Sequence, residues 1–128
     1  MGELDGKVAI VTGAGRLRGI GRAAAVELAR LGSDVVVTGT GRNPDSFPPD
    51  EKAIGWRDVE SVADQIREHG RKALTSIVDV TNFLNVQNLV DQTISAFGRV
   101  DILINNAAFP RGIDRVPVLD LEEDIFQK

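Results

Sequence analysis

The stretch that decides the fold is VAIVTGAGRLRGIGRAAAVELARLG, residues 8–32. It opens with an apolar run rich in β-branched residues that stops at Gly13, a pattern typical of a buried parallel strand. Apolar residues then recur at helical spacing up to Gly32, where a left-handed residue can end a helix. The expected inward-facing residues of this helix are Ile20, Ala24, Leu28 and Leu31. The letters TGAGRLRGIG therefore predict a glycine-rich turn that joins a strand to a helix.

The alternation of strand and helix continues along the chain. Further strands are predicted at DVVVTG (34–39), ALTSIVDV (73–80) and VDILINNAA (100–108). One helix is expected between Asp58, which can cap its start, and Gly70, and another between Thr81 and Gly98. Their expected buried faces are Val59, Val62, Ala63 and Ile66, and then Val86, Leu89, Val90, Thr93 and Phe97. This order predicts an α/β fold, a parallel sheet with helices on both faces.

Composition excludes several classes of protein. The chain has 128 residues, of which 42% are hydrophobic and 27% charged, as expected for one soluble globular domain. Its net charge of −4 gives no general attraction to nucleic acid. Without cysteine, and with His69 as the single histidine, we expect no disulfide and no metal site. No apolar run predicts a signal peptide or a membrane span, so we expect a cytoplasmic protein.

The glycine turn carries the first indication of function. Between a strand and a helix, backbone N–H groups and the helix dipole can receive a pyrophosphate. A glycine pattern alone is weak evidence, but DVT at 79–81 and NNAA at 105–108 accompany this one. Together these motifs resemble the short-chain dehydrogenase/reductase family, from GKVAIVTGAG to GRVDILINNAA.

The resemblance implies a Rossmann-type doubly wound parallel sheet, here the first four strands in the order 3-2-1-4. Residues 1–128 would then be the N-terminal part of a single NAD(P)-binding domain, whose catalytic part is not in the sequence. The expected pyrophosphate-lining residues are Gly13, Gly19, Ile20 and Gly21. Asp79 and the backbone of Val80 would contact the adenine, Asn106 and Ala107 would border the adenosine ribose, and Asn105 would hold the central strands together. The alternatives are strand-end capping by Asn105 and Asn106 and a helix-entry role for Asp79.

The glycine turn departs from the family in its length. Five residues separate Gly13 from Gly19, where the family usually has three. Both ends of the motif are in place, so we expect the extra residues to loop outward and to carry Arg18 toward the ribose.

Charge at the end of the second strand predicts the cofactor. Enzymes that use NAD usually place a carboxylate there for the ribose 2′-hydroxyl. This chain has Gly39 instead, and no carboxylate before Asp45. Arg18 and Arg42 could pair with a 2′-phosphate, with Thr40 donating a hydroxyl, so NADP(H) is favoured over NAD(H). The alternative is that both arginines are solvated loop charges.

The connection at 41–57 is long for a compact α/β unit. Its prolines disfavour helix, and Phe47 and Trp56 offer anchors for packing. Two interpretations stay open: a surface excursion pinned by the two aromatics, or a flap near the adenosine end of the cofactor.

The resemblance implies an oxidoreductase that moves a hydride between nicotinamide and a carbonyl or secondary alcohol, homo-oligomeric at full length. The family's tyrosine acid–base group is absent, since the chain contains no tyrosine, so we assign no catalytic residue and expect the chain alone to be inactive. Phe109 and Arg111 are either pocket residues or part of a plain connecting loop. The rival functions are a non-catalytic dinucleotide sensor and a structural α/β module with an empty glycine turn.

Overall fold

Four parallel strands form the centre of the molecule in the computed structural model, which describes residues 2–106. They are β1 (Val8–Thr12), β2 (Asp34–Gly39), β3 (Ala73–Ile77) and β4 (Ile102–Asn105). Their order in the sheet is β3-β2-β1-β4, and every neighbouring pair is parallel. The predicted strand order is confirmed.

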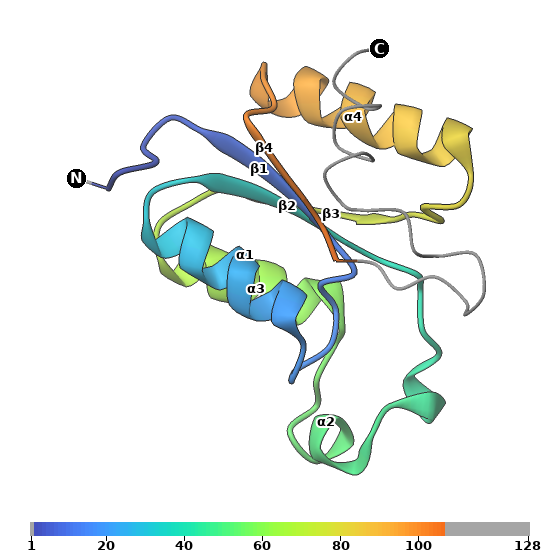
Figure 1. Cartoon of the computed structure of the whole chain (residues 1–128). Helices are drawn as coiled ribbons and strands as arrows, with labels where there is room; N and C mark the ends of the chain where they lie inside the picture. Colours follow the sequence, from blue (N-terminus) through green and yellow to red (C-terminus); the bar gives the residue numbers. More distant parts are fainter. Residues whose placement is uncertain (1, 107–128) are drawn as a thin grey trace.

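Helices cover both faces of the sheet (Figure 1). Helices α1 (Ile20–Arg30) and α3 (Val59–Glu68) lie on one face, and α4 (Phe83–Phe97) lies on the other. A hydrophobic core fills each side, so the central strands are buried on both faces. Val35 and Val37 of β2 point into the core under α1 and α3, whereas Val36 between them points into the core under α4. This two-sided burial explains the continuous apolar runs of the sequence, and the predicted α/β class is confirmed.

The buried face of α1 differs from the predicted one. Gly21, Ala25 and Ala29 are the buried residues of this helix, and Ile20 is 78% exposed. Small residues at four-residue spacing let the helix axis approach the sheet closely, which larger side chains would prevent. The predicted inward position of Ile20 was therefore wrong.

Helix α4 is capped one residue later than predicted. The side-chain oxygen of Asn82 accepts hydrogen bonds from the N–H groups of Leu84 and Asn85, at 2.9 and 3.2 Å. Asn82 is thus the N-cap in place of Thr81, whose hydroxyl is bonded to Asp79.

The long connection contains two short helical segments, η1 (Pro44–Ser46) and α2 (Pro49–Ala53), where the sequence predicted no helix. A proline at the first position of a helix loses no hydrogen bond, because that N–H has no intrahelical partner. Phe47 and Trp56 are buried, at 6% and 8% exposure, and belong to the core under α1 and α3. The predicted anchoring role of both aromatics is confirmed.

Candidate functional site

The carboxyl ends of β1 and β4 are joined by side chains. Thr12 Oγ1 donates a hydrogen bond to Asn105 Oδ1 at 2.9 Å and accepts one from the Asn106 N–H at 3.1 Å. Asn106 Nδ2 in turn donates to the carbonyl oxygen of Gly13 at 3.1 Å. Asn105 therefore ties the two strands together, as predicted, and Asn106 lies against the first glycine of the turn.

Helix α1 starts in close contact with this strand edge. A Cβ on Gly21 would lie 2.7 Å from the carbonyl oxygen of Gly13 and 2.8 Å from Asn106 Nδ2. Gly13 itself has a φ of +66°, a conformation that favours glycine. The structure thus brings together three of the predicted site residues, Gly13, Gly21 and Asn106.

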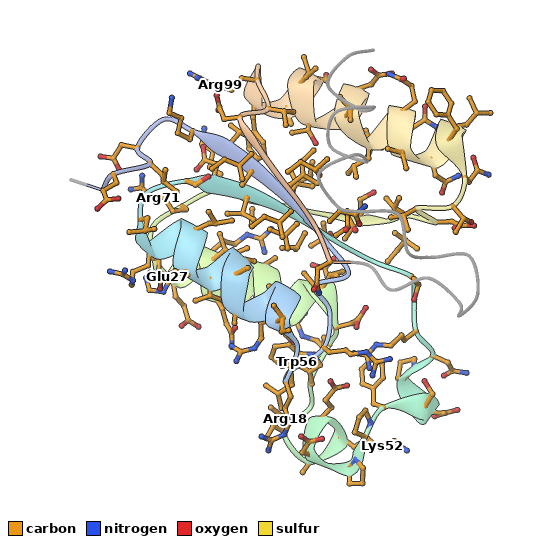
Figure 2. The ribbon with its side chains drawn as sticks, in the orientation of Figure 1. Arg18, Glu27, Lys52, Trp56, Arg71 and Arg99 are labelled. Atoms are coloured by element: carbon orange, nitrogen blue, oxygen red, sulfur yellow. The ribbon has the colours of Figure 1, made fainter. Side chains whose placement is uncertain are left out.

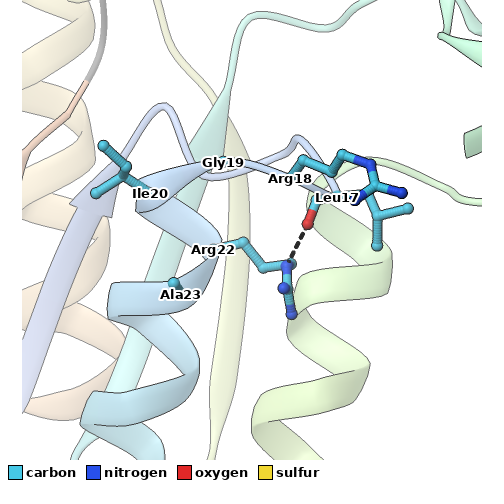
Figure 3. Close-up of a pocket in the computed structure, with 6 residues that line it drawn as sticks. All are labelled: Leu17, Arg18, Gly19, Ile20, Arg22 and Ala23. Atoms are coloured by element: carbon cyan, nitrogen blue, oxygen red, sulfur yellow. Dashed lines mark hydrogen bonds between the residues drawn. The ribbon is translucent and has the colours of Figure 1, made fainter.

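The amino end of α1 is open to an anion. Its N-cap is Gly19, which has no side chain to accept hydrogen bonds from the first turn, and that turn carries no acidic residue. The N–H groups of a first helical turn have no intrahelical acceptor and form the positive end of the helix dipole. A hollow opens here, lined by Leu17, Arg18, Gly19, Ile20, Arg22 and Ala23 (Figure 3). These features suit a phosphate group.

The glycine turn is held in place by the long connection. Trp56 Nε1 donates to the carbonyl oxygen of Gly15 at 2.6 Å, and Glu51 Oε2 accepts from the Leu17 N–H at 2.9 Å. Arg22 Nε also donates to the Leu17 carbonyl oxygen, at 2.6 Å (Figure 3). The enlarged turn and the long connection therefore fit each other, a relation that no local sequence signal could reveal.

Arg42 lies in a buried ion-pair network. Its Nε and Nη2 donate to Asp58 Oδ1 at 2.9 and 2.7 Å, and Nη2 lies 3.1 Å from Glu51 Oε1. Its guanidinium carbon is 4.4 Å from the centre of the Phe47 ring. The Arg42, Glu51 and Asp58 side chains are 14%, 3% and 13% exposed. The guanidinium predicted to receive a 2′-phosphate is thus engaged by two carboxylates.

Arg18 and Thr40 lie at the surface. The Arg18 side chain, labelled in Figure 2, is 80% exposed. It pairs with Asp50 at the start of α2. The hydrogen bond from Arg18 holds the pKa of Asp50 below its usual value. Thr40 is exposed just after the end of β2.

The contacts of Asp58 were not predicted from the sequence. This residue precedes α3, as predicted, but its carboxylate makes no capping bond. Its φ of 60° and ψ of −132° are unusual for an aspartate. A Cβ on Gly15 would lie 2.2 Å from Asp58 Oδ1, and one on Gly39 would lie 3.0 Å from Oδ2. The carboxylate therefore occupies the space between the glycine turn and the end of β2.

Asp79 forms a local turn at the end of the β3 segment. Its Oδ1 accepts hydrogen bonds from the hydroxyl and the N–H of Thr81, at 2.6 and 2.9 Å, and these bonds lower its pKa. Asp79 is exposed, and Val80 packs beside the core under α4. This geometry is compatible with both the adenine contact and the helix-entry role. Ala107, Phe109 and Arg111 lie outside the described residues.

Within residues 2–106, no group of three or more histidine, cysteine, aspartate or glutamate side chains is arranged to hold a metal ion. No helix in the same range is long and apolar enough to cross a membrane.

Asp101 couples the start of β4 to β1, and it predicts a pH effect. Its carboxylate accepts from Arg99 at 2.7 Å and from the Val8 N–H at 2.9 Å, and these bonds lower its pKa. A carboxyl whose pKa is lower in the folded state stabilises the fold above its unfolded pKa, about 3.9. That stabilisation disappears as the pH falls through the lowered folded pKa.

We expect Asp101→Asn to flatten the acid part of the stability curve, because the variant has no carboxyl to protonate there. Urea unfolding of both proteins from pH 7 to pH 2 measures this. Parallel curves for the two proteins below pH 4 would contradict the assignment.

Known proteins are similar to this chain along most of its length. The family described as "short chain dehydrogenase" matches residues 7–128. The chain is 40% identical over 126 residues to the short chain dehydrogenase/reductase astE of Aspergillus oryzae, covering 98% of this chain and 42% of that protein. It is 41% identical over 104 residues to a cyclohexanol dehydrogenase of Rhodococcus sp. strain TK6, covering 81% of this chain and 37% of the relative.

A solved structure shows the same fold. The short chain dehydrogenase of Mycobacterium paratuberculosis bound to NAD superposes with a TM-score of 0.68 at 29% sequence identity. The match covers 98% of this chain and 44% of that one. The chain thus spans about two fifths of the length of the relatives that it matches.

Proposed function

The chain belongs to the short-chain dehydrogenase/reductase family, and from this we propose that residues 1–128 supply the cofactor-binding part of an NAD(P)(H)-dependent oxidoreductase. They would form the N-terminal part of one Rossmann domain. The observation that carries the proposal is the uncapped amino end of α1, which is packed against Gly13 and Asn106 at the carboxyl edge of the sheet. Ligands of open α/β sheets bind at this edge.

In the proposed complex, each part of the dinucleotide contacts a different part of the site. The pyrophosphate lies on the first turn of α1, bordered by Gly13, Gly19, Ile20 and Gly21. Exposure of Ile20 supports this, because an apolar side chain beside an open anion site can cover the bound cofactor. The adenine contacts Asp79 and the backbone of Val80, and Asn106 and Ala107 border the adenosine ribose. The hydrogen bonds from Trp56 to Gly15 and from Leu17 to Glu51 hold the backbone of the turn, which supports a site formed before the cofactor binds.

The reaction class follows from the family. When bound, the nicotinamide accepts or donates the hydride, and the substrate is a small carbonyl compound or secondary alcohol. The residues of this chain bind and orient the dinucleotide; none of them is assigned as the acid–base group, since the sequence has no tyrosine. We propose a homo-oligomer for the whole protein.

The contacts of Arg42 bear on the cofactor preference. The sequence favoured NADP(H) because Arg18 and Arg42 were expected to pair with a 2′-phosphate. Arg42 is instead enclosed by Asp58, Glu51 and Phe47, so this support is lost. Arg18 remains accessible, but as a single exposed guanidinium already paired with Asp50.

Substitution of Gly19 tests the proposed site. A Cβ at position 19 would lie no closer than 3.4 Å to its neighbours, and the φ of Gly19 is −93°, so alanine fits the free protein. A methyl group would nevertheless project where the pyrophosphate approaches the backbone. We expect Gly19→Ala to weaken binding of ADP-ribose at least about tenfold, with the free energy of unfolding changed by less than about 1 kcal/mol.

Isothermal titration calorimetry measures the affinity, and urea unfolding of the same samples is the control. Equal affinity of variant and wild type would show that the phosphate lies elsewhere. Absence of ADP-ribose binding to the wild type, with a cooperative unfolding transition, would favour the structural α/β module.

A further inference from the structure

We infer that Asp58 supplies the ribose-binding carboxylate that β2 lacks, and that it makes the site selective for NAD(H) against NADP(H). This inference rests on the proposed function and adds to it the residue that selects the cofactor. It replaces the preference expected from the sequence. The carboxylate reaches the site from the residue before α3, nineteen positions after Gly39 in the chain.

The Asp58 carboxylate lies beside the end of β2. In dinucleotide-binding folds an acidic side chain near the end of the second strand binds the ribose 2′-hydroxyl. The corresponding residue here is Gly39, the last residue of β2. A Cβ on Gly39 would lie 3.0 Å from Asp58 Oδ2, so the Asp58 carboxylate lies where a side chain at position 39 would extend. The opposite side is formed by Gly15 of the glycine turn, whose Cβ would overlap Asp58 Oδ1.

Asp58 Oδ2 is available to accept a further hydrogen bond. Within residues 2–106, both hydrogen bonds that the Asp58 carboxylate accepts go to Oδ1, and both come from Arg42. Oδ2 accepts none, and it is not among the fully buried unpaired atoms of this range, so it keeps access to solvent. A carboxylate oxygen accepts hydrogen bonds and donates none. Oδ2 can therefore accept from a ribose hydroxyl while Arg42 fixes the other oxygen.

The charges around Arg42 are unbalanced. The network holds two carboxylates, Asp58 and Glu51, against one guanidinium, Arg42, which leaves a formal net charge of −1 in a largely buried place. The one guanidinium is shared, since Nη2 lies 2.7 Å from Asp58 Oδ1 and 3.1 Å from Glu51 Oε1. A 2′-phosphate brought to Oδ2 would meet like charge in surroundings of reduced dielectric constant, whereas a hydroxyl would meet an acceptor.

The backbone of Asp58 is strained. Its φ of 60° with ψ of −132° is a conformation that few residues other than glycine adopt. Such a conformation persists where surrounding contacts hold it, and here two hydrogen bonds from Arg42 hold the carboxylate. In this conformation the carboxylate lies beside Gly15 and Gly39 and makes no capping bond to α3.

Two ligands that differ by one phosphate test the inference. ADP-ribose and 2′-phospho-ADP-ribose contain the adenosine end of NAD(H) and NADP(H) and need no catalytic residues. We expect the wild-type chain to bind ADP-ribose at least about tenfold more tightly than its 2′-phosphate, as measured by calorimetry at 0.1 M salt. This measurement needs no variant, so a folding defect cannot obscure it.

Asp58→Asn then identifies the residue. The amide keeps one oxygen for Arg42 and places an NH2 group where Oδ2 stood, so it loses the charge and gains a donor that a ribose hydroxyl or a phosphate oxygen can accept from. We therefore expect the affinity ratio to fall about tenfold, mainly through tighter binding of the 2′-phosphate. Asp45→Asn is the matched control, since it removes an exposed carboxylate of the same connection and should leave the ratio unchanged.

The outcomes separate the two proposals. A wild-type preference for the 2′-phosphate, equal binding of the two ligands, or an unchanged ratio in Asp58→Asn would overturn the role of Asp58 while leaving the dinucleotide site intact. Failure of both ligands to bind would overturn the proposed function and this inference with it.

Discussion

Arg42→Met is expected to destabilise the fold by about 3–5 kcal/mol, because it leaves two buried carboxylates without their cation. Glu51 is 2% exposed and Asp58 is largely buried, so neither carboxylate can recover full hydration. Native domains are stable by about 5–15 kcal/mol, so this loss is a large part of the total. The glycine turn should loosen as well, since Glu51 and Trp56 hold it from the same connection.

Urea unfolding measures the effect, and two further variants control it. Arg30→Met removes an arginine whose pairing with Glu27 is exposed on both sides, and it should change stability by less than about 1 kcal/mol. Adding Glu51→Gln and Asp58→Asn to Arg42→Met removes the unpaired charges and should restore much of the loss. Equal losses in the free energy of unfolding for Arg42→Met and Arg30→Met would show that the Arg42 network does not stabilise the fold.

The sheet could be predicted because its signal is local. Each strand of the centre is an apolar run that ends at a turn residue, and the alternation with helical periodicity fixes parallel strands. In β2, Val35 and Val37 point into one core and Val36 points into the other. Because neither face of the strand meets solvent, every position in the run can be apolar. Some of the sequence-based errors fall at element ends, as at Asn82, where two neighbouring residues can both act as caps.

The charge network could not be predicted because it depends on contacts distant in the sequence. Arg42, Glu51 and Asp58 are separated by up to sixteen positions in a connection without periodicity, and they meet Gly15 of the glycine turn. From sequence alone Arg42 is a free cation and Asp58 a helix cap. The available signal was the pair of glycines, Gly15 and Gly39, at the two places where a side chain would displace the carboxylate.

Gly21→Ala is expected to affect binding and stability together. The added methyl group would lie 2.7 Å from the carbonyl oxygen of Gly13 and 3.0 Å from the Cα of Ala14, and both atoms belong to the backbone. Because backbone cannot yield as a flexible side chain does, the start of α1 must move away from the strand edge. We expect a loss of about 1–3 kcal/mol in the free energy of unfolding and ADP-ribose affinity reduced about a hundredfold.

Gly19→Ala is the matched control for this variant, two residues earlier in the same motif. The nearest atoms to its added methyl group lie at 3.4 Å, an ordinary contact, so it should weaken binding while leaving stability nearly unchanged. The pair therefore separates the two uses of glycine in the turn. At position 21 glycine permits the close packing of helix and strand at the proposed site, and at position 19 we expect it to leave room for the pyrophosphate. Equal stability of the two variants would show that α1 can shift without strain, and the close approach at Gly21 would then have no part in forming the site.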